Sequence, residues 1–211
     1  MQIQLTWKSL KNISSAILLL LAFTVISQAQ QTSNQKTPAV KIKNFGQMDE
    51  RFYRGARPKT QEDFKDLAAM GITTVIDLTE DPAETERVAV EASGMKYVHI
   101  PMVEKKYPTE AAISAFLKVA NDPATGKFFL HCAGGRHRTG AMGAVDRYQN
   151  YHWNFEQFYA EMKKYDFYTS WGHGAFKDFV KDYYDQMQAA KATAGASIST
   201  TAGAAGQTHD K

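Results

Sequence analysis

Short apolar runs alternate with amphipathic stretches along this chain, from about residue 41 to residue 187. Residues 72–78 and 128–130 are nearly continuous runs of β-branched, aliphatic or aromatic residues, which is typical of strands buried on both faces. Residues 97–101 form a further apolar run, and residues 41–48 are expected to form an edge strand. The pattern therefore predicts several short strands, most of them buried in a sheet.

The stretches between these runs carry apolar residues at helical spacing and helix-capping residues at their starts. Thr60 is expected to cap a helix that ends at Gly71, and Asn154 with Gln157 has the spacing of a capping box. Further helices are expected over residues 83–92, 108–120, 139–151 and 175–187. Strands that alternate with helices predict one α/β domain, residues 41–188, with a mainly parallel central sheet flanked by helices.

The N-terminal segment differs from the rest in composition. Lys8 and Lys11 precede an apolar run over residues 13–26, and Ser27-Gln28-Ala29 has the small-residue pattern of a cleavage site. The run is shorter than the ~20 apolar residues of a spanning helix. Residues 1–29 are therefore expected to be a secretory signal peptide, with a retained membrane anchor as the alternative. A cleaved chain would be exported, to the periplasm or as a secreted protein, without stable membrane insertion.

Two polar or small-residue segments flank the expected domain. Residues 30–40 are polar and are expected to form a linker, and residues 189–211 are rich in Ala, Gly, Ser and Thr. Because such segments bury little apolar surface, we expect the C-terminal one to be a disordered tail.

Overall composition limits the classes of partner. The chain has 211 residues, 44% of them hydrophobic, and a formal net charge of +3. This mild positive charge suits anionic ligands, but no Lys/Arg run of the kind that binds nucleic acid is present, so no nucleic-acid partner is expected. The single cysteine excludes an intramolecular disulfide and favours a reactive role. The sequence gives no prediction of oligomeric state.

That cysteine, Cys132, begins a glycine-rich loop between the strand ending near Leu130 and a helix expected from Thr139. A strand that leads through glycines into a helix N-terminus makes an anion site, because the loop amides and the helix dipole can face one centre. The residues expected to bind the anion are those of the loop, namely Ala133, Gly134, Gly135, Arg136 and His137.

Cys132, Arg138 and Thr139 are the candidate catalytic residues of this loop. A thiol facing such amides and a guanidinium is stabilised as the thiolate, which is a nucleophile. Arg138 offers a planar fork for two phosphate oxygens. The Thr139 hydroxyl can donate to the sulfur and help it leave in a second step. His131 is expected to orient the cysteine backbone through ring hydrogen bonds.

The sequence His131-Cys132-x5-Arg138-Thr139-Gly140 resembles the signature of the protein tyrosine phosphatase superfamily, and its Gly-Arg-His-Arg-Thr-Gly portion is most similar to the atypical dual-specificity branch. Phe52-Tyr-Arg-Gly-Ala-Arg-Pro58 is similar to a segment near the start of dual-specificity domains. The resemblance implies a dual-specificity phosphatase-like fold and two-step hydrolysis through a cysteinyl-phosphate. It also implies that no metal or other cofactor is needed.

The resemblance further implies an acidic residue on a separate loop, which protonates the leaving group. The matching segment, residues 102–108, contains no aspartate, and Glu104 is its only carboxylate. Glu104 is therefore the candidate general acid, with a solvated loop charge as the alternative interpretation. Glu80 and Asp81, which follow another strand, are second candidates.

Three functions remain open at this stage. The first is an exported phosphatase acting on phosphotyrosine and on phosphoserine or phosphothreonine in proteins. The second keeps the chemistry but uses inositol polyphosphates or phosphoinositides, favoured by basic side chains at Lys105, Lys106, Arg136 and His137. The third is a catalytically weak phosphate-binding module, suggested by the missing aspartate. The remaining histidines, His99, His152, His173 and His209, lack the spacing of metal ligands and are expected to be structural or on the surface.

Overall fold

The structure is a computed structural model that describes residues 40–204, with side chains placed as far as residue 194. The expected signal peptide, residues 1–29, and nearly all of the expected linker lie outside the described residues, as do residues 205–211. Among the helices that are described, none combines the length and apolar character needed to cross a bilayer.

One five-stranded sheet, with strand order β1-β2-β5-β3-β4, forms the centre of the domain. The parallel strands are β2 (Phe52–Ala56), β5 (Lys127–Cys132), β3 (Ile72–Asp77) and β4 (Lys96–His99). Only the edge strand β1 (Gly46–Gln47) is antiparallel to its neighbour, β2. The prediction of an α/β domain with a mainly parallel sheet is therefore confirmed.

The edge strand is much shorter than the predicted 41–48. Asn44 adopts a left-handed conformation with φ of 55°, and the Phe45 amide donates to the Ile42 carbonyl. This turn interrupts the extended chain, so only two residues remain to pair with β2.

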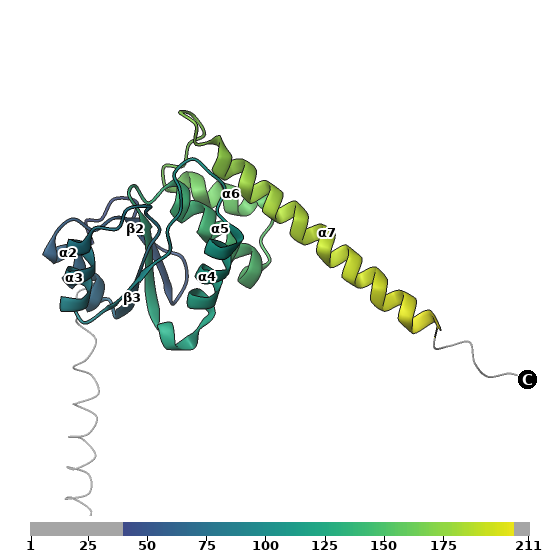
Figure 1. Cartoon of the computed structure of the whole chain (residues 1–211), viewed down its shortest axis with the longest axis horizontal. Coiled ribbons are helices and arrows are strands. Elements are labelled where there is room, and N and C mark those ends of the chain that lie inside the picture. Colours follow the sequence, from purple (N-terminus) through teal and green to yellow (C-terminus); the bar gives the residue numbers. More distant parts are fainter. Residues whose placement is uncertain (1–39, 205–211) are drawn as a thin grey trace, which may run out of the picture. The chain divides into compact units, whose positions relative to one another are not determined.

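Helices cover both faces of the sheet (Figure 1). On one side lie α2 (Gln61–Ala69) and α3 (Glu84–Ala92), and on the other lie α4 (Glu110–Asn121), α5 (His137–Tyr151), α6 (Phe155–Lys164) and α7 (Gly174–Ala204). A short 3-10 helix, Pro123–Thr125, connects α4 to β5. The predicted capping box of Asn154 with Gln157 forms, and Thr60 caps α2 as predicted, in a capping box with Asp63.

Each face of the sheet has its own hydrophobic core. The α2/α3 side is filled by residues such as Phe64, Leu67 and Val90, and the larger α4–α7 side by residues such as Phe116, Leu130 and Phe176. Helix α5 is buried from His137 to Tyr148. Its first half contains Gly140, Ala141, Gly143 and Ala144, and these small residues let it approach the sheet closely. Close packing of α5 fixes the position of its N-terminus next to the end of β5.

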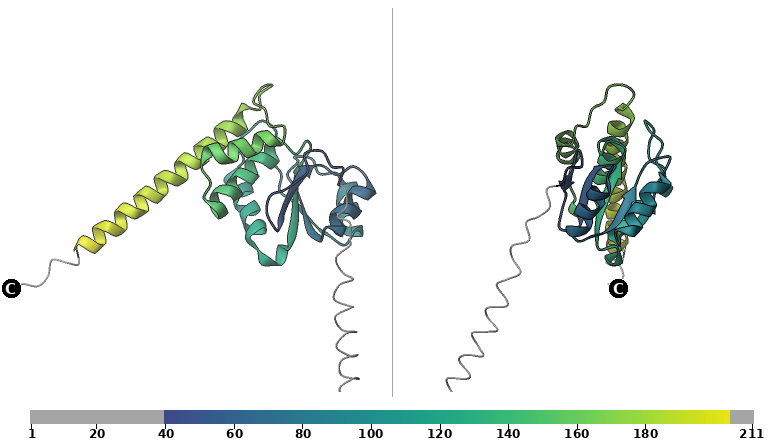
Figure 2. Two further views of the ribbon diagram at one scale, coloured as in Figure 1. Left: turned by 180° about the vertical axis from the view of Figure 1, so that it is seen from behind. Right: turned by 90° about the vertical axis from the view of Figure 1, so that its left-hand side faces the viewer.

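The prediction of a disordered tail over residues 189–211 is wrong for its first part, because α7 continues to Ala204 (Figure 2). Phe176, Phe179 and Val180 are buried in the core, and Met187 is the last hydrophobic residue of α7, among those with placed side chains, that packs against it. Residues 188–194 are exposed. The sequence there is rich in alanine, which has the highest intrinsic helix propensity, so it can continue a helix that the core has started.

Candidate active site

The signature segment forms a loop between β5 and α5. Cys132 is the last residue of β5, and α5 begins at His137, so residues 133–136 make the whole connection. Cys132 is at the carboxyl end of a central parallel strand, where α/β folds place their ligand sites. The α5 N-terminus has no side-chain cap. Its free amides and dipole are therefore available to an anion bound in the loop.

Hydrogen bonds from outside hold the loop carbonyls. The Asn44 side-chain amide donates to the Gly134 carbonyl at 2.8 Å, and Arg54 Nη2 donates to the Gly135 carbonyl at 2.7 Å. The Arg57 amide lies 3.4 Å from the Ala133 carbonyl. Carbonyls fixed away from the loop centre leave the loop amides to face an anion, as in other anion-binding nests.

Position 135 accommodates only glycine, for steric reasons. Its φ is +66°, and a Cβ atom there would lie 2.3 Å from the Gly55 carbonyl carbon and 2.5 Å from the Ala56 nitrogen. These are backbone atoms of β2, which cannot move away without disturbing the sheet. The close approach at Gly135 is therefore to the backbone of β2.

We predict that Gly135→Ala lowers the free energy of unfolding by about 1–3 kcal/mol or more, since it adds backbone strain and a backbone clash. Urea unfolding followed by circular dichroism measures this. Gly134→Ala is the matched control, because the nearest atoms to a Cβ there belong to the flexible Arg136 side chain, at 3.8 Å. Equal stability of the two variants would contradict the prediction.

The environment of Cys132 favours the thiolate. Burial alone would raise the pKa of Cys132, but the hydroxyl and amide of Thr139, the charge of Arg138 and the Gly134 amide together hold it below its ordinary value. The Thr139 hydroxyl is itself buried. A lowered pKa in a site that also attracts anions is the property expected of a nucleophilic cysteine.

Arg138 connects the loop to the segment that carries Glu104. Its Nη1 donates to the Met102 carbonyl at 3.2 Å, and the side chain is buried. Glu104 lies two residues further and lines the same small cavity as Cys132. Glu80 and Asp81 are not among the residues that line this cavity. Of the three candidate acids, only Glu104 lines the cavity that Cys132 lines.

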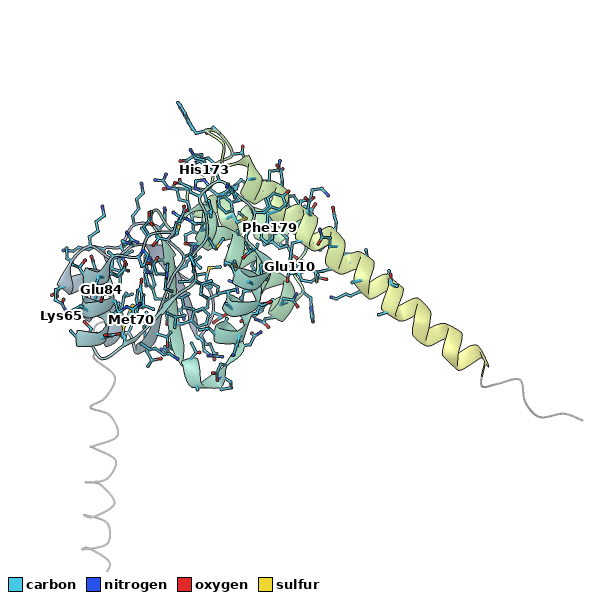
Figure 3. All side chains as sticks on the ribbon, viewed as in Figure 1. Lys65, Met70, Glu84, Glu110, His173 and Phe179 are labelled. Carbon is cyan, nitrogen blue, oxygen red and sulfur yellow. The ribbon has the colours of Figure 1, made fainter. Side chains whose placement is uncertain are left out.

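The cavity has a volume of about 160 Å³. Of the expected site residues, Gly135 and Thr139 do not line it. The lining combines the other seven with two residues from the α6–α7 loop: Glu104, Cys132, Ala133, Gly134, Arg136, His137, Arg138, Tyr168 and His173. Tyr168 was not selected from the sequence, and His173 was expected to be structural or on the surface. Figure 3 labels His173 just before α7. No motif marks this loop, so only the fold could show that it forms a wall of the site.

The two histidines of the cavity contact each other. The rings of His137 and His173 stack with centroids 3.8 Å apart, and His137 Nε2 lies 3.0 Å from the Tyr168 carbonyl. Burial, and next the proximity of His173, lowers the pKa of His137 to about 4. Burial and the Lys105 charge lower the pKa of His173 as well. His137 is thus neutral at pH 7, and it lines the cavity as an uncharged side chain that can hydrogen-bond.

His131 does not make the contact expected from the sequence. Its Nε2 lies 2.9 Å from Glu86 Oε1 and its Nδ1 lies 3.8 Å from Asp77 Oδ1. These three buried residues bring ligand atoms within 4.8 Å of one another, a grouping that metal sites also show. Here Arg57 Nε already lies 2.9 Å from Glu86, and Arg57 Nη2 lies 3.4 Å from Asp77. A guanidinium in this position supplies the positive charge that a metal ion would bring.

Three solved structures of similar fold are distant from this chain in sequence. The core catalytic domain of the PP-IP phosphatase SIW14 from S. cerevisiae has 20% identity and a TM-score of 0.61, covering 73% of this chain and 93% of its own. TpbA from P. aeruginosa has 19% identity and a TM-score of 0.54, with 67% and 91% covered. Tk-PTP has 18% identity and a TM-score of 0.53, with 66% and 97% covered. These likenesses show the fold alone, and the comparison with curated proteins found no match.

The comparison with family models is more specific. Residues 23–182, well over half of the chain, match the family described as "DSP-PTPase phosphatase fused to NAD+ Kinase". The matched region contains the whole Cys132–Arg138 loop and the Glu104 segment. The chain therefore belongs to this family of cysteine-dependent phosphatases with the dual-specificity phosphatase fold.

Proposed function

We propose that Cys132, Arg138, Thr139 and Glu104 carry out phosphomonoester hydrolysis in two steps. The Cys132 thiolate attacks phosphorus, the bond from phosphorus to the ester oxygen breaks, and Glu104 gives that oxygen a proton. Water, deprotonated by Glu104, then attacks the cysteinyl-phosphate and releases phosphate and the thiolate. Arg138 binds two phosphate oxygens, and Thr139 stabilises the departing sulfur.

The observation that carries this proposal is the lowered pKa of Cys132 at the bottom of a cavity with Arg138 and Glu104 on its walls. A site that only bound phosphate would gain nothing from a thiolate, whose negative charge repels the ligand. For this reason we favour an enzyme over a catalytically weak binding module. Release of phosphate from p-nitrophenyl phosphate, unchanged by EDTA, is the expected result. A purified, folded protein that binds phosphate but releases none from this ester would support the module.

Our leading candidate substrates are proteins phosphorylated on tyrosine, and on serine or threonine. The volume of the small cavity suits one phosphate with its first attached atoms, and Tyr168 adds an aromatic side chain to its wall. A solved structure of TpbA, with the substitution C132S in TpbA's own numbering, is a complex with pTyr. That structure has 20% identity to this chain and a TM-score of 0.50. That complex suggests phosphotyrosine as the first probe for this chain.

A second substrate class, inositol polyphosphates, is favoured by a larger neighbouring cavity of about 790 Å³. Ala133, Gly134 and Arg136 line both cavities, so the larger cavity is adjacent to the one that contains Cys132. Besides Arg57, which is paired with Asp77 and Glu86, four cationic side chains line the larger cavity, namely Lys41, Lys43, Lys59 and Arg136, against three acidic ones, Glu62, Asp63 and Asp66. A substrate with several phosphates would use this excess of positive charge. SIW14, described as a PP-IP phosphatase, shares the fold.

A panel of phosphopeptides and inositol phosphates, with Lys41→Ala and Lys59→Ala, tests the choice between substrates. For an inositol polyphosphate substrate, both variants should raise KM severalfold while leaving kcat/KM on p-nitrophenyl phosphate unchanged. Lys118→Ala is the control, since Lys118 is exposed on α4 away from both cavities. Higher kcat/KM on phosphotyrosine peptides than on every inositol phosphate would select the leading candidate.

We also propose that the protein is exported, on the basis of the basic, apolar and small-residue pattern of residues 1–29. Protein recovered from its native host should then begin near Gln30. Edman sequencing of that protein measures the N-terminus directly. Membrane-bound protein that keeps Met1 would show a retained anchor.

A further inference from the structure

Arg54 of β2 is a charged side chain in an unusual environment. It is 1% exposed, which makes it one of the largest fully buried side chains. Its Nη2 donates to the Gly135 carbonyl at 2.7 Å, and its guanidinium carbon lies 4.1 Å above the centre of the Tyr165 ring. Its Nε has no hydrogen-bond partner among the described residues.

A buried charge normally has an ion-pair partner, because taking an unpaired charge out of water costs several kcal/mol. Within the part of the chain that the structure describes, no carboxylate forms an ion pair with Arg54. The nearest candidate, Glu161 of α6, is committed to Arg147, with both of its oxygens within 3.1 Å of that guanidinium. The charge of Arg54 is therefore balanced by something other than a carboxylate.

Arg54 lies beneath the candidate active site. Its strand pairs in parallel with β5, with Arg54 beside Leu130 and Ala56 beside Cys132. Leu130 and Cys132 belong to the core on the α5 side, and Arg54 points to that side as well, since its nitrogens approach Gly140 and Gly143 of α5. The guanidinium thus occupies the space under the loop and the first turn of α5, on the same face as the cysteine.

The charged and titratable groups that face Arg54 are consistent with this placement. Burial lowers the pKa of Arg54 to about 10, while Tyr165, Cys132 and Glu161 act to raise it and Arg147 acts to lower it. Arg54 stays charged at neutral pH. Since Glu161 is paired with Arg147, the Cys132 thiolate is a negative charge near Arg54 that has no salt bridge of its own among the described residues.

We propose that Arg54 is a positioning residue of the phosphatase site, whose buried charge stabilises the Cys132 thiolate while its hydrogen bond holds the Gly135 carbonyl. Arg138 approaches the phosphate from inside the cavity, whereas Arg54 acts through the loop from the side of the sheet. The contribution of Arg54 to turnover rests on the proposed function. Its effect on the ionisation of Cys132 can be measured without any turnover.

The chain's single cysteine allows a direct test. The rate of alkylation by iodoacetamide, followed against pH, reports the thiolate midpoint of Cys132 alone. Arg54→Gln removes the charge, and its amide ends two bonds short of the Nη2 atom that donates to the Gly135 carbonyl, so this variant should raise the midpoint by about one unit or more. Arg54→Lys, which keeps the charge, should stay within about half a unit of wild type. Binding of inorganic phosphate should weaken in Arg54→Gln.

Arg51→Gln is the matched control. Arg51 also donates to backbone carbonyls, those of Gly126 and Asp122, but at the opposite end of β5. A folded Arg54→Gln variant with the midpoint of wild type, or an equal shift in Arg51→Gln, would overturn the proposal. Equal shifts in Arg54→Gln and Arg54→Lys would assign Arg54 a purely structural role and would overturn it too.

Tyr165→Leu provides a second route if Arg54→Gln does not fold. This variant removes the ring that holds the guanidinium, so the midpoint should rise in the same direction, and an unchanged midpoint would contradict the proposal. The alkylation midpoint and turnover are separate measurements. An Arg54-dependent midpoint in a protein without phosphatase activity would overturn the proposed function and leave the role of Arg54 standing.

Discussion

Cys132→Ser is expected to abolish turnover while leaving phosphate binding largely intact. Chemistry depends on a thiolate, and a serine hydroxyl in the same place stays protonated because its pKa is far above that of a thiol. Loss of a nucleophile of this kind costs about 10⁴–10⁶-fold in kcat. Phosphate binding rests on the loop amides and Arg138, which the substitution leaves in place. Phosphate release from p-nitrophenyl phosphate gives kcat, and thermal shift with inorganic phosphate gives binding.

The substitution is also small in structural terms. Cys132 is buried, and serine differs from it by one atom, so the fold should persist. Thr139→Ser is a useful companion variant, because it keeps the hydroxyl that faces the sulfur and should retain most of the rate. A Cys132→Ser protein with more than about 1% of wild-type turnover would remove Cys132 from the role of nucleophile.

Local sequence signals predicted most of the fold. The capping residues Thr60 and Asn154 act through hydrogen bonds within one helical turn, so they can be recognised without the tertiary structure. The buried strands were visible for a similar reason, since a strand covered on both faces must be apolar throughout. The signature loop combined both kinds of signal with a fixed spacing from Cys132 to Arg138.

Features that depend on distant parts of the chain were not predictable in this way. Whether Arg54 is an exposed or a buried cation depends on Tyr165 and Gly135, which are far from it in sequence. His173 reaches the cavity only because α7 packs against α5. The extension of α7 past Met187 follows from a helix already nucleated by the core, which the composition of residues 189–204 does not reveal.

Glu104→Gln is expected to slow hydrolysis of poor leaving groups by about 10²–10⁴-fold, the usual contribution of general acid catalysis. Departure of phenol or of a serine hydroxyl requires a proton on the ester oxygen, whereas p-nitrophenolate leaves with little help. The loss should therefore be large on phenyl phosphate or phosphoserine and smaller on p-nitrophenyl phosphate. The fall of kcat at high pH should also flatten, because it reports loss of the proton from the acid.

Glu80→Gln is the control for this prediction, since Glu80 is an exposed carboxylate beyond the end of β3 that does not line the cavity. An unchanged rate on phenyl phosphate in Glu104→Gln would make Glu104 a loop charge. Proton transfer would then fall to bulk water, because burial and the Lys105 charge disfavour the protonated form of His173, whose Nε2 lies 3.9 Å from Glu104 Oε1. His137 is a poorer donor, because its pKa of about 4 leaves it without the extra proton at pH 7. An enzyme without an efficient proton donor should be slow on all phosphate esters except those with good leaving groups, such as p-nitrophenyl phosphate.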